Sequence, residues 1–347
     1  MPDLKKRIIM NLKTTYCFDD VLLVPSFSEI SSRREIDLTS SLGQDLVLSL
    51  PIISSPMDTV TEVAMSKAMS SSGCLGVLHR YNTIGEQSKM VQEASAAGSV
   101  AAAIGVTGDY LDRARALVRA GVNALCVDIA HGHHSMMRHA LKVLRNTFGT
   151  DIHIMAGNVA TLEAFNDLSD WGADSVRVGI GGGSICSTRI QTGHGVPTLQ
   201  SVMDCSVSDR PAKLVADGGI RNSGDIVKAL GAGADFVMVG SLLSGTQETP
   251  TEEIVINGEK YKSYRGMASL DAQIEWRGHT SSVEGVSSTV PCKGPVSNII
   301  SSLETGIRSG LSYTGAKNLV EFHSRAKFIV QTSSGAVESS THINKLK

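Results

Sequence analysis

The chain has 347 residues, enough for one large domain or two ordinary ones, and 41% of them are hydrophobic. Only 19% are charged and the formal net charge is −2, which argues against a nucleic-acid-binding surface. No segment has the length and hydrophobicity of a membrane span, and the N-terminal stretch lacks the apolar core of a signal peptide. We therefore expect a cytoplasmic protein without nucleic-acid or membrane partners.

Eight short apolar runs, each followed by a polar or glycine-rich turn and a helix-like segment, predict the strands. They are Pro51–Ser54, Cys74–Leu78, Val100–Ile104, Ala124–Val127, Ile152–Met155, Ser175–Val178, Lys213–Ala216 and Phe236–Val239. Strands that alternate with helices are parallel, and eight such units predict an α/β fold of the (β/α)8 barrel type. The alternative is a doubly wound open sheet, but the GxGxxG turn usual after its first strand is absent.

The segments between and after these strands complete the expected architecture. The clearest helix patterns are Tyr110–Ala120, His134–Asn146, Leu162–Trp171 and Ser223–Gly231. An Asn-Gly turn between β-like flanks predicts a hairpin over Ile254–Ser263. Residues 268–293 are polar with little periodicity, which is typical of a mobile flap near a site. With a C-terminal tail over residues 331–347, the whole chain, 1–347, is expected to be one catalytic domain.

The six cysteines have no CxxC spacing, which disfavours a zinc site or a disulfide framework. Cys74, Cys126 and Cys205 are interpreted as small buried hydrophobic residues. Cys186 differs, because it follows a buried run and sits in a turn with four glycines. Such turns bring backbone N–H groups close to an anion, and a thiol held there can act as a nucleophile. The turn therefore predicts a thiol beside a phosphate-bearing substrate.

Barrel enzymes place their chemistry where the strands end. The residues just after the predicted strands are Ser54-Ser55-Pro56-Met57-Asp58, His79-Arg80, Asp128, Gly157-Asn158, the Cys186 turn, Asp217-Gly218-Gly219 and Gly240-Ser241. The last two are glycine-rich and follow the seventh and eighth strands, a position that suits a phosphate. Asp217 is placed to accept hydrogen bonds from ribose hydroxyls, so together these turns predict a nucleoside monophosphate site.

Simpler explanations exist for several of these residues. Asp128 also fits a helix N-cap, and Asp217-Gly218-Gly219 also fits a tight turn without a ligand. His131, His133 and His134 lack carboxylate or cysteine partners at ligand spacing. We interpret them as surface or helix-start histidines rather than a metal site.

Several motifs follow one another in a specific order. They are Phe18-Asp19-Asp20-Val21-Leu22-Leu23, Ser54-Ser55-Pro56-Met57-Asp58-Thr59-Val60, the Cys186 turn, Ala216-Asp217-Gly218-Gly219-Ile220-Arg221, Tyr264-Arg265-Gly266-Met267 and Glu284-Gly285. In these motifs the chain resembles the IMP dehydrogenase/GMP reductase family over nearly its whole length. The resemblance implies a barrel enzyme, usually a homotetramer. It also implies action on GMP or IMP through a covalent bond from the cysteine to C2 of the purine.

The resemblance also implies residue roles. Cys186 is the nucleophile, and Thr188 with Glu284 forms the proton relay that ionises the thiol and handles the leaving group. The implied substrate subsite is Ser55, Met57, Ser184, Asp217, Gly219, Gly240, Ser241, Tyr264, Gly266 and Met267. The implied cofactor subsite is Arg80, Asp128, Ile129, Ala130, Asn158 and Gly179. No arginine pocket for the 2′-phosphate of a cofactor is visible in the sequence.

The two activities of the family share the covalent intermediate and then differ. The dehydrogenase oxidises IMP to XMP with NAD and hydrolyses the thioimidate, using a long flap with an Arg-Tyr pair. The reductase takes GMP, expels ammonia and reduces the intermediate to IMP with NADPH. Four features resemble the reductase. There is no room for regulatory CBS domains between His79 and Val100, and the loop between Met267 and Glu284 is short and lacks the Arg-Tyr pair, since Gly278 follows Arg277. The other two are sequence segments that resemble those of reductases: Val127-Asp128-Ile129-Ala130 and Ile154-Met155-Ala156-Gly157-Asn158.

Other segments resemble bacterial dehydrogenases more closely: Gly240-Ser241, Tyr261–Met267, Pro291–Pro295 and Gly335–Ser339. The last implies a potassium site shared between subunits, with Glu338 and the backbone carbonyls of Gly181, Gly183 and Cys186, since carbonyl oxygens suit this cation. Gly182 stands where the family usually has proline, which we expect to loosen the turn.

The sequence thus predicts reductive deamination of GMP with NADPH. The alternative is an NAD-dependent IMP dehydrogenase without CBS domains, with Arg277 as the hydrolytic base. A non-catalytic nucleotide-binding barrel is a third interpretation, but a pure binder has no need for Cys186, Thr188 and Glu284 together.

Overall fold

The computed structural model describes residues 12–43 and 46–339. Its centre is a closed parallel barrel of β4 (Ile52–Ser54), β5 (Leu75–Leu78), β6 (Val100–Ile104), β7 (Ala124–Asp128), β8 (His153–Val159), β9 (Ser175–Val178), β10 (Lys213–Asp217) and β11 (Phe236–Val239). Val237 of β11 pairs with Ile52 of β4, which closes the ring. Every predicted apolar run forms one of these strands, so the (β/α)8 prediction is confirmed and the open sheet is excluded.

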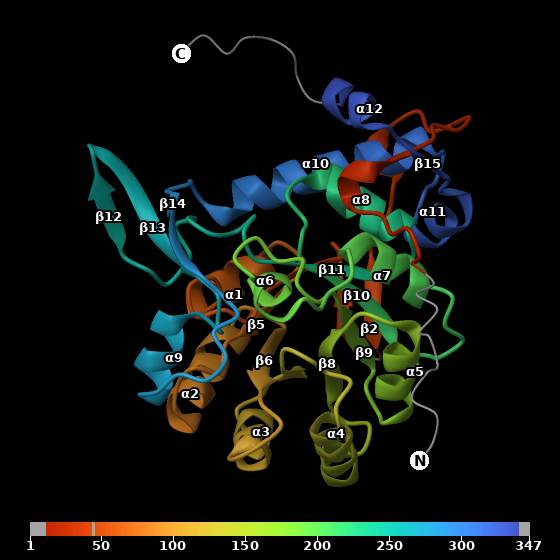
Figure 1. Ribbon diagram of the computed structural model, residues 1–347. Coiled ribbons are helices and arrows are strands. Elements are labelled where there is room, and N and C mark those ends of the chain that lie inside the picture. The colour runs from red at the N-terminus through yellow and green to blue at the C-terminus, as the bar shows by residue number, and fades with distance from the viewer. Residues whose placement is uncertain (1–11, 44–45, 340–347) are drawn as a thin grey trace, which may run out of the picture.

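Helices cover the outside of the barrel (Figure 1). They are α1 (Val63–Ser71), α2 (Ile84–Ser95), α3 (Tyr110–Arg119), α4 (Ser135–Phe148), α5 (Leu162–Asp170), α7 (Thr198–Cys205), α8 (Ser223–Gly231) and α10 (Val296–Tyr313). Thr83, Thr161 and Asn222 begin α2, α5 and α8, each side chain accepting a hydrogen bond from the backbone N–H three residues on. The four predicted helices are confirmed to within two residues at each end.

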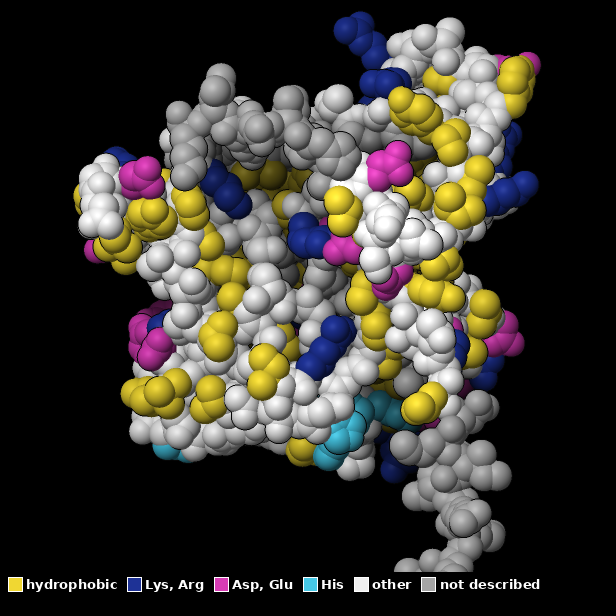
Figure 2. Space-filling view, turned by 45° about the horizontal axis from the view of Figure 1, so that its top comes forward, with side chains coloured by type: hydrophobic (Ala, Val, Ile, Leu, Met, Phe, Trp, Pro, Cys, Tyr) yellow, Lys and Arg dark blue, Asp and Glu magenta, His cyan; other side chains and the backbone are white. Residues whose placement is uncertain are grey.

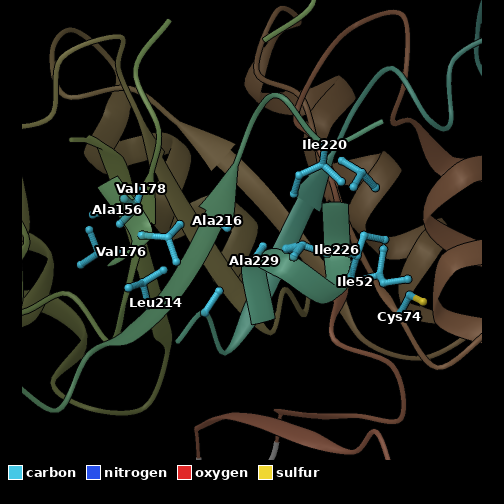
Figure 3. Packing of buried hydrophobic residues seen from close by; sticks show 14 of the residues in the cluster. Ile52, Cys74, Ala156, Val176, Val178, Leu214, Ala216, Ile220, Ile226 and Ala229 are labelled. Carbon is cyan, nitrogen blue, oxygen red and sulfur yellow. The ribbon is translucent and has the colours of Figure 1, made fainter. Parts of the chain in front are cut away.

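Apolar side chains form two layers. The outer layer lies between strands and helices, and it includes Ile52, Val178 and Leu214 of the barrel and Ile226 of α8 (Figure 3). The inner layer fills the barrel and includes three leucines of a hairpin, β2 (Ser40–Gly43) and β3 (Leu46–Leu48), which covers the end where the strands begin. The opposite end of the barrel is left for the site.

The three cysteines predicted to be inert are all buried. Burial raises the pKa of the Cys74 and Cys205 thiols to about 12 and that of Cys126 to about 11. These thiols stay protonated at neutral pH, and the prediction is confirmed.

The two ends of the described chain meet beside α8. There β1 (Val21–Leu23) pairs antiparallel with β15 (Phe328–Val330). Next to this sheet along the chain lie the short 3-10 turn η1 (Phe18–Asp20) and the helices α11 (Leu319–Arg325) and α12 (Ser333–Glu338), while a second 3-10 turn, η2 (Arg33–Glu35), contacts α10. The predicted C-terminal tail therefore contains a helix in its described part, and residues 340–347 lie outside the described residues.

A small antiparallel sheet stands beside the barrel mouth (Figure 1). It consists of β12 (Glu253–Ile256), β13 (Glu259–Arg265) and β14 (Ser287–Pro291). Asn257 and Gly258 join the first two strands with φ of 51° and 84°, so the predicted hairpin is confirmed.

The flap predicted over residues 268–293 includes regular secondary structure. This segment contains α9 (Leu270–Arg277) and β14. The Ser269 side chain caps the start of α9 by accepting from Ala272 N, and Gly278 ends it in the left-handed region. Leu270 and Ile274 stay exposed, so the helix has no apolar stripe that the sequence could reveal.

No helix in the described part of the chain is long and apolar enough to cross a membrane. On the face seen in Figure 2, Lys and Arg side chains are scattered among acidic and hydrophobic ones. That face presents no single basic patch.

Candidate active site

A cavity of about 500 Å³ lies at the end of the barrel where the strands terminate. All the residues predicted for catalysis, for the substrate subsite and for the cofactor subsite line it, as do Gly181 and Gly183. Glu338 does not, because it lies on α12. The structure thus brings together every predicted site residue except this one.

The three predicted catalytic residues form a continuous line of hydrogen bonds. The Cys186 thiol donates to Thr188 Oγ1 at 3.2 Å, and that hydroxyl donates to Glu284 Oε2 at 2.8 Å. The second carboxylate oxygen of Glu284 accepts from Ser282 Oγ at 2.9 Å. A thiol proton can therefore pass through one hydroxyl to a carboxylate, which is how a nucleophilic cysteine is activated.

Backbone pairing holds this line in register. Cys186 and Gly285 form an antiparallel bridge, with Ser187 N donating to Glu284 O at 2.9 Å and Val286 N to Ile185 O at 3.0 Å. Thr188 begins the short helix α6 (Thr188–Thr192) just after the turn. Two segments about a hundred residues apart in sequence are thus fixed against each other at the reacting thiol.

Gln273 of α9 fixes the flap that carries Glu284. Its side chain is buried, and Nε2 donates to the carbonyls of Ala268 and Ser282, both at 3.0 Å. Its Oε1 accepts from Ser281 N at 2.9 Å and from Ser281 Oγ at 3.0 Å. No signal in the sequence pointed to this residue, since one glutamine in a polar segment is ordinary.

Tyr81 anchors the flap to the barrel. Its hydroxyl donates to Met267 O at 2.7 Å, and its ring stacks on Trp276 with centroids 5.9 Å apart. The guanidinium carbons of Arg80 and Arg277 lie 5.7 and 5.8 Å from the centre of the same ring, within cation–π range. Both arginines line the cavity, which therefore has a cationic corner that the sequence did not reveal.

The predicted phosphate residues gather around one tyrosine. The Tyr264 hydroxyl is hydrogen-bonded to Ser184 and Ser241, and burial raises its pKa, opposed by those two bonds. Gly218 and Gly219 form the neighbouring turn with φ of 94° and 77°, values that residues with side chains rarely adopt. Hydroxyls and glycine backbone therefore converge at one place, as an anion site requires.

Gly182, the departure from the family pattern, has a packing reason. A Cβ at this position would lie 2.2 Å from Thr198 Oγ1 at the start of α7. Thr198 is buried, and its hydroxyl has no hydrogen-bond partner in the described part of the chain. A side chain here would require the turn or Thr198 to shift, so glycine permits a close approach in addition to loosening the turn.

A buried arginine joins the two predicted acids. Arg177 of β9 donates from Nη1 to Asp128 Oδ1 at 2.6 Å and from Nη2 and Nε to Asp217 Oδ2 at 2.9 and 3.1 Å. Burial lowers its pKa, but Cys126 and the two carboxylates raise it, and it lies well above its ordinary value. Arg177 was not among the predicted site residues, although a charged residue inside an apolar strand was a usable signal.

One of the three neighbouring histidines begins a helix, as predicted. His134 caps α4 by accepting from Met136 N at 3.1 Å, so the interpretation of Asp128 as an N-cap is wrong. His133 pairs with Asp167 at 2.9 Å and stacks on Trp171. Among the described residues no group of three or more His, Cys, Asp or Glu side chains is arranged to hold a metal.

Comparison with known proteins places these features in a family. Residues 15–342 match the IMP dehydrogenase / GMP reductase domain. An inosine-5′-monophosphate dehydrogenase of Nitrosopumilus maritimus is 33% identical, over 96% of this chain and 99% of its own. A GMP reductase of Leishmania major is 31% identical, over 95% and 97%. A crystal structure of a GMP reductase variant from Trypanosoma brucei in complex with guanosine 5′-monophosphate superposes with a TM-score of 0.91 at 31% identity, covering 96% of this chain and 99% of the other.

The alignment lengths weaken one reason for preferring a reductase. The N. maritimus dehydrogenase aligns over 472 positions and the L. major reductase over 477, against 347 residues in this chain. Relatives of both names thus carry residues without a counterpart here. The lack of an inserted domain pair therefore does not separate the two activities.

Proposed function

The chain belongs to the IMP dehydrogenase/GMP reductase family of oxidoreductases, and from this premise we propose that it is a GMP reductase. It converts GMP and NADPH, with one proton, into IMP, ammonia and NADP. The observation that carries the proposal is the line from Cys186 through Thr188 to Glu284 beneath a short, folded flap.

The proposed reaction begins at the thiol. The Cys186 proton passes through Thr188 to Glu284, and the thiolate attacks C2 of the guanine. Glu284 returns the proton to the departing amino group, which leaves as ammonia, and C2 remains bonded to sulfur. NADPH, when bound, supplies a hydride to C2. The carbon–sulfur bond then breaks, IMP leaves, and the thiolate takes a proton from solvent.

The walls of the cavity hold the substrate for this sequence. Ser184, Ser241 and Tyr264 bind the phosphate, where their hydroxyls already meet. Asp217 Oδ1, which accepts no hydrogen bond from the described part of the chain, receives the ribose hydroxyls. Met267 lies over the base, its carbonyl fixed by Tyr81.

Two features favour reduction over hydrolysis. The flap is held by four hydrogen bonds of Gln273, and Glu284 already reaches the relay, so no long mobile arm is available to deliver water. Arg277, the base of the alternative mechanism, lies with Arg80 against Tyr81. Two guanidinium groups there suit an anionic group of the cofactor.

A paired assay tests the direction. Purified enzyme is given GMP with NADPH in one cuvette and IMP with NAD in another, and ammonia release is measured in the first. We expect loss of NADPH matched by ammonia, and no turnover in either cuvette for Cys186→Ala. NADH formation from IMP, with no reaction of GMP, would establish the alternative: an NAD-dependent IMP dehydrogenase without CBS domains.

We also propose the potassium site and the homotetramer. Carbonyl oxygens of Gly181, Gly183 and Cys186 fit a hard cation, although the Gly183 carbonyl also accepts from Cys186 N at 3.1 Å. Glu338 lies away from this turn, so it would come from a second copy of the chain. Replacing potassium by sodium should lower the rate, as should Glu338→Gln, and light scattering gives the subunit number.

A further inference from the structure

Arg177 lies between the predicted substrate subsite and the predicted cofactor subsite. It lies on β9, flanked by β8 and β10, and its side chain is 7% exposed. Asp128, at the end of β7, binds one edge of the guanidinium, and Asp217, at the end of β10, binds the other. These carboxylates belong to the predicted cofactor side and substrate side of the cavity.

The two oxygen atoms of each carboxylate have different partners. Asp217 Oδ2 takes three donors, two from Arg177 and one from Asn158 Nδ2 at 2.8 Å, which leaves Oδ1 for a ligand. Asp128 Oδ1 is held by Arg177 Nη1, while its Oδ2 lies 3.7 Å from Arg80 Nε. Each carboxylate thus turns one oxygen to the shared arginine and keeps the other toward the cavity.

We propose that Arg177 is a positioning residue that couples nucleotide binding to cofactor binding. The inference rests on the proposed function in placing the ribose at Asp217 and the cofactor at Asp128. One guanidinium forms ion pairs with two carboxylates. A ligand that binds one carboxylate and weakens its ion pair with Arg177 therefore changes the strength of the ion pair between Arg177 and the other carboxylate. The pairs are largely removed from water, where such interactions are poorly screened.

The surroundings of Arg177 keep it from adapting freely. A Cβ on Gly157 would lie 2.6 Å from Arg177 Cβ, so the stem packs against bare backbone. Nη1 also lies 3.4 Å from Cys126 Sγ. A planar fork held at its stem transmits a shift of one carboxylate to the other, which a flexible lysine with a single ammonium cannot do.

Isothermal titration calorimetry tests the coupling. The affinity of GMP is measured with and without saturating NADP, a pair that does not react, and the ratio of the two dissociation constants is the coupling factor. We expect a factor of about five or more in the unchanged enzyme and a factor within about twofold of one in Arg177→Lys. Arg80→Lys is the matched control, because Arg80 reaches Asp128 and not Asp217. It should weaken cofactor binding and leave the coupling factor as it was.

An unchanged coupling factor in Arg177→Lys, or no coupling in the original enzyme, overturns the proposal. If Arg177→Lys does not fold, Asp128→Asn replaces it. Its effect on GMP affinity without cofactor should be about threefold or more, and no effect also overturns the proposal. If the enzyme proves to be a dehydrogenase, the same ratio is measured with IMP and NADH. Failure of the proposed function and failure of the coupling are then separate results.

Discussion

The close packing of Gly182 against Thr198 predicts that a substitution at position 182 is destabilising and that a second substitution at position 198 reverses the effect. In Gly182→Ala the new Cβ would lie 2.2 Å from Thr198 Oγ1, whereas ordinary contact begins at 3.4 Å, so one of the two must move. The φ of Gly182 lies outside the left-handed range, and backbone strain therefore plays no part. Overpacking of this kind costs about 1–3 kcal/mol, and a turn displaced by ~1 Å at the nucleophile lowers the rate by about 100-fold.

Thr198→Ala should restore what Gly182→Ala removes. The Thr198 hydroxyl has no partner in the described residues, so its loss costs little by itself. In the double variant the Cβ has space, and urea unfolding together with kcat/KM for GMP should return close to the values of Thr198→Ala alone. The matched control is Gly181→Ala, at φ of 78° and against the Arg189 side chain, which Thr198→Ala should not rescue.

A double-mutant cycle measures the interaction between the two positions. Coupling of about 1 kcal/mol or more between positions 182 and 198 supports the steric account. Additive effects, or equal rescue of Gly181→Ala, would show that Gly182 is needed for another reason.

Three further predictions concern the flap, the proton relay and His153 at the start of β8. Gln273→Leu removes four hydrogen bonds within the flap, so kcat should fall about tenfold with little change in GMP affinity. An unaltered kcat would count against the role of Gln273 in placing Glu284. Thr188→Val interrupts proton transfer and should lower kcat by about 10²–10⁴, while calorimetry still detects GMP binding; near-normal turnover would rule out the relay. Burial lowers the pKa of His153 to about 4 from 6.5, so the unfolded chain takes up a proton that the folded one excludes. The free energy of unfolding should therefore decrease by up to about 3 kcal/mol as pH falls from about 6.5 to 4, and a His153→Gln variant with the same slope would refute this.

The barrel was predictable because its physics is local. Strands buried on both faces need unbroken apolar runs, and the glycine turns that follow them are equally visible in the sequence. The same is true of the hairpin around Asn257 and Gly258, where the turn type demands those residues.

The site contacts that could not be predicted from the sequence are formed only when the barrel closes. Arg177 meets partners 49 and 40 residues away, and only the order of strands around the ring shows that both acids reach it. Tyr81 and Met267 are 186 residues apart. Helix α9 escaped detection because its larger apolar side chains, such as Leu270 and Ile274, are exposed and it is held by its caps and by Gln273. Periodicity reports burial, so it is silent about elements held by polar contacts.

The pairing of β1 with β15 imposes an order on folding during synthesis. In the described chain β1 has no other strand partner, and the Arg221 and Gln331 side chains bind Asp19 just before it. On the ribosome, β1 therefore lacks its strand partner until residue 330 has left the exit tunnel, although Arg221 and Lys228 can already bind the segment just before it. The eight barrel strands are all synthesised by then and are free to close first. The β1–β15 sheet is thus among the last elements to form, and a nascent chain that ends before β15 cannot form it.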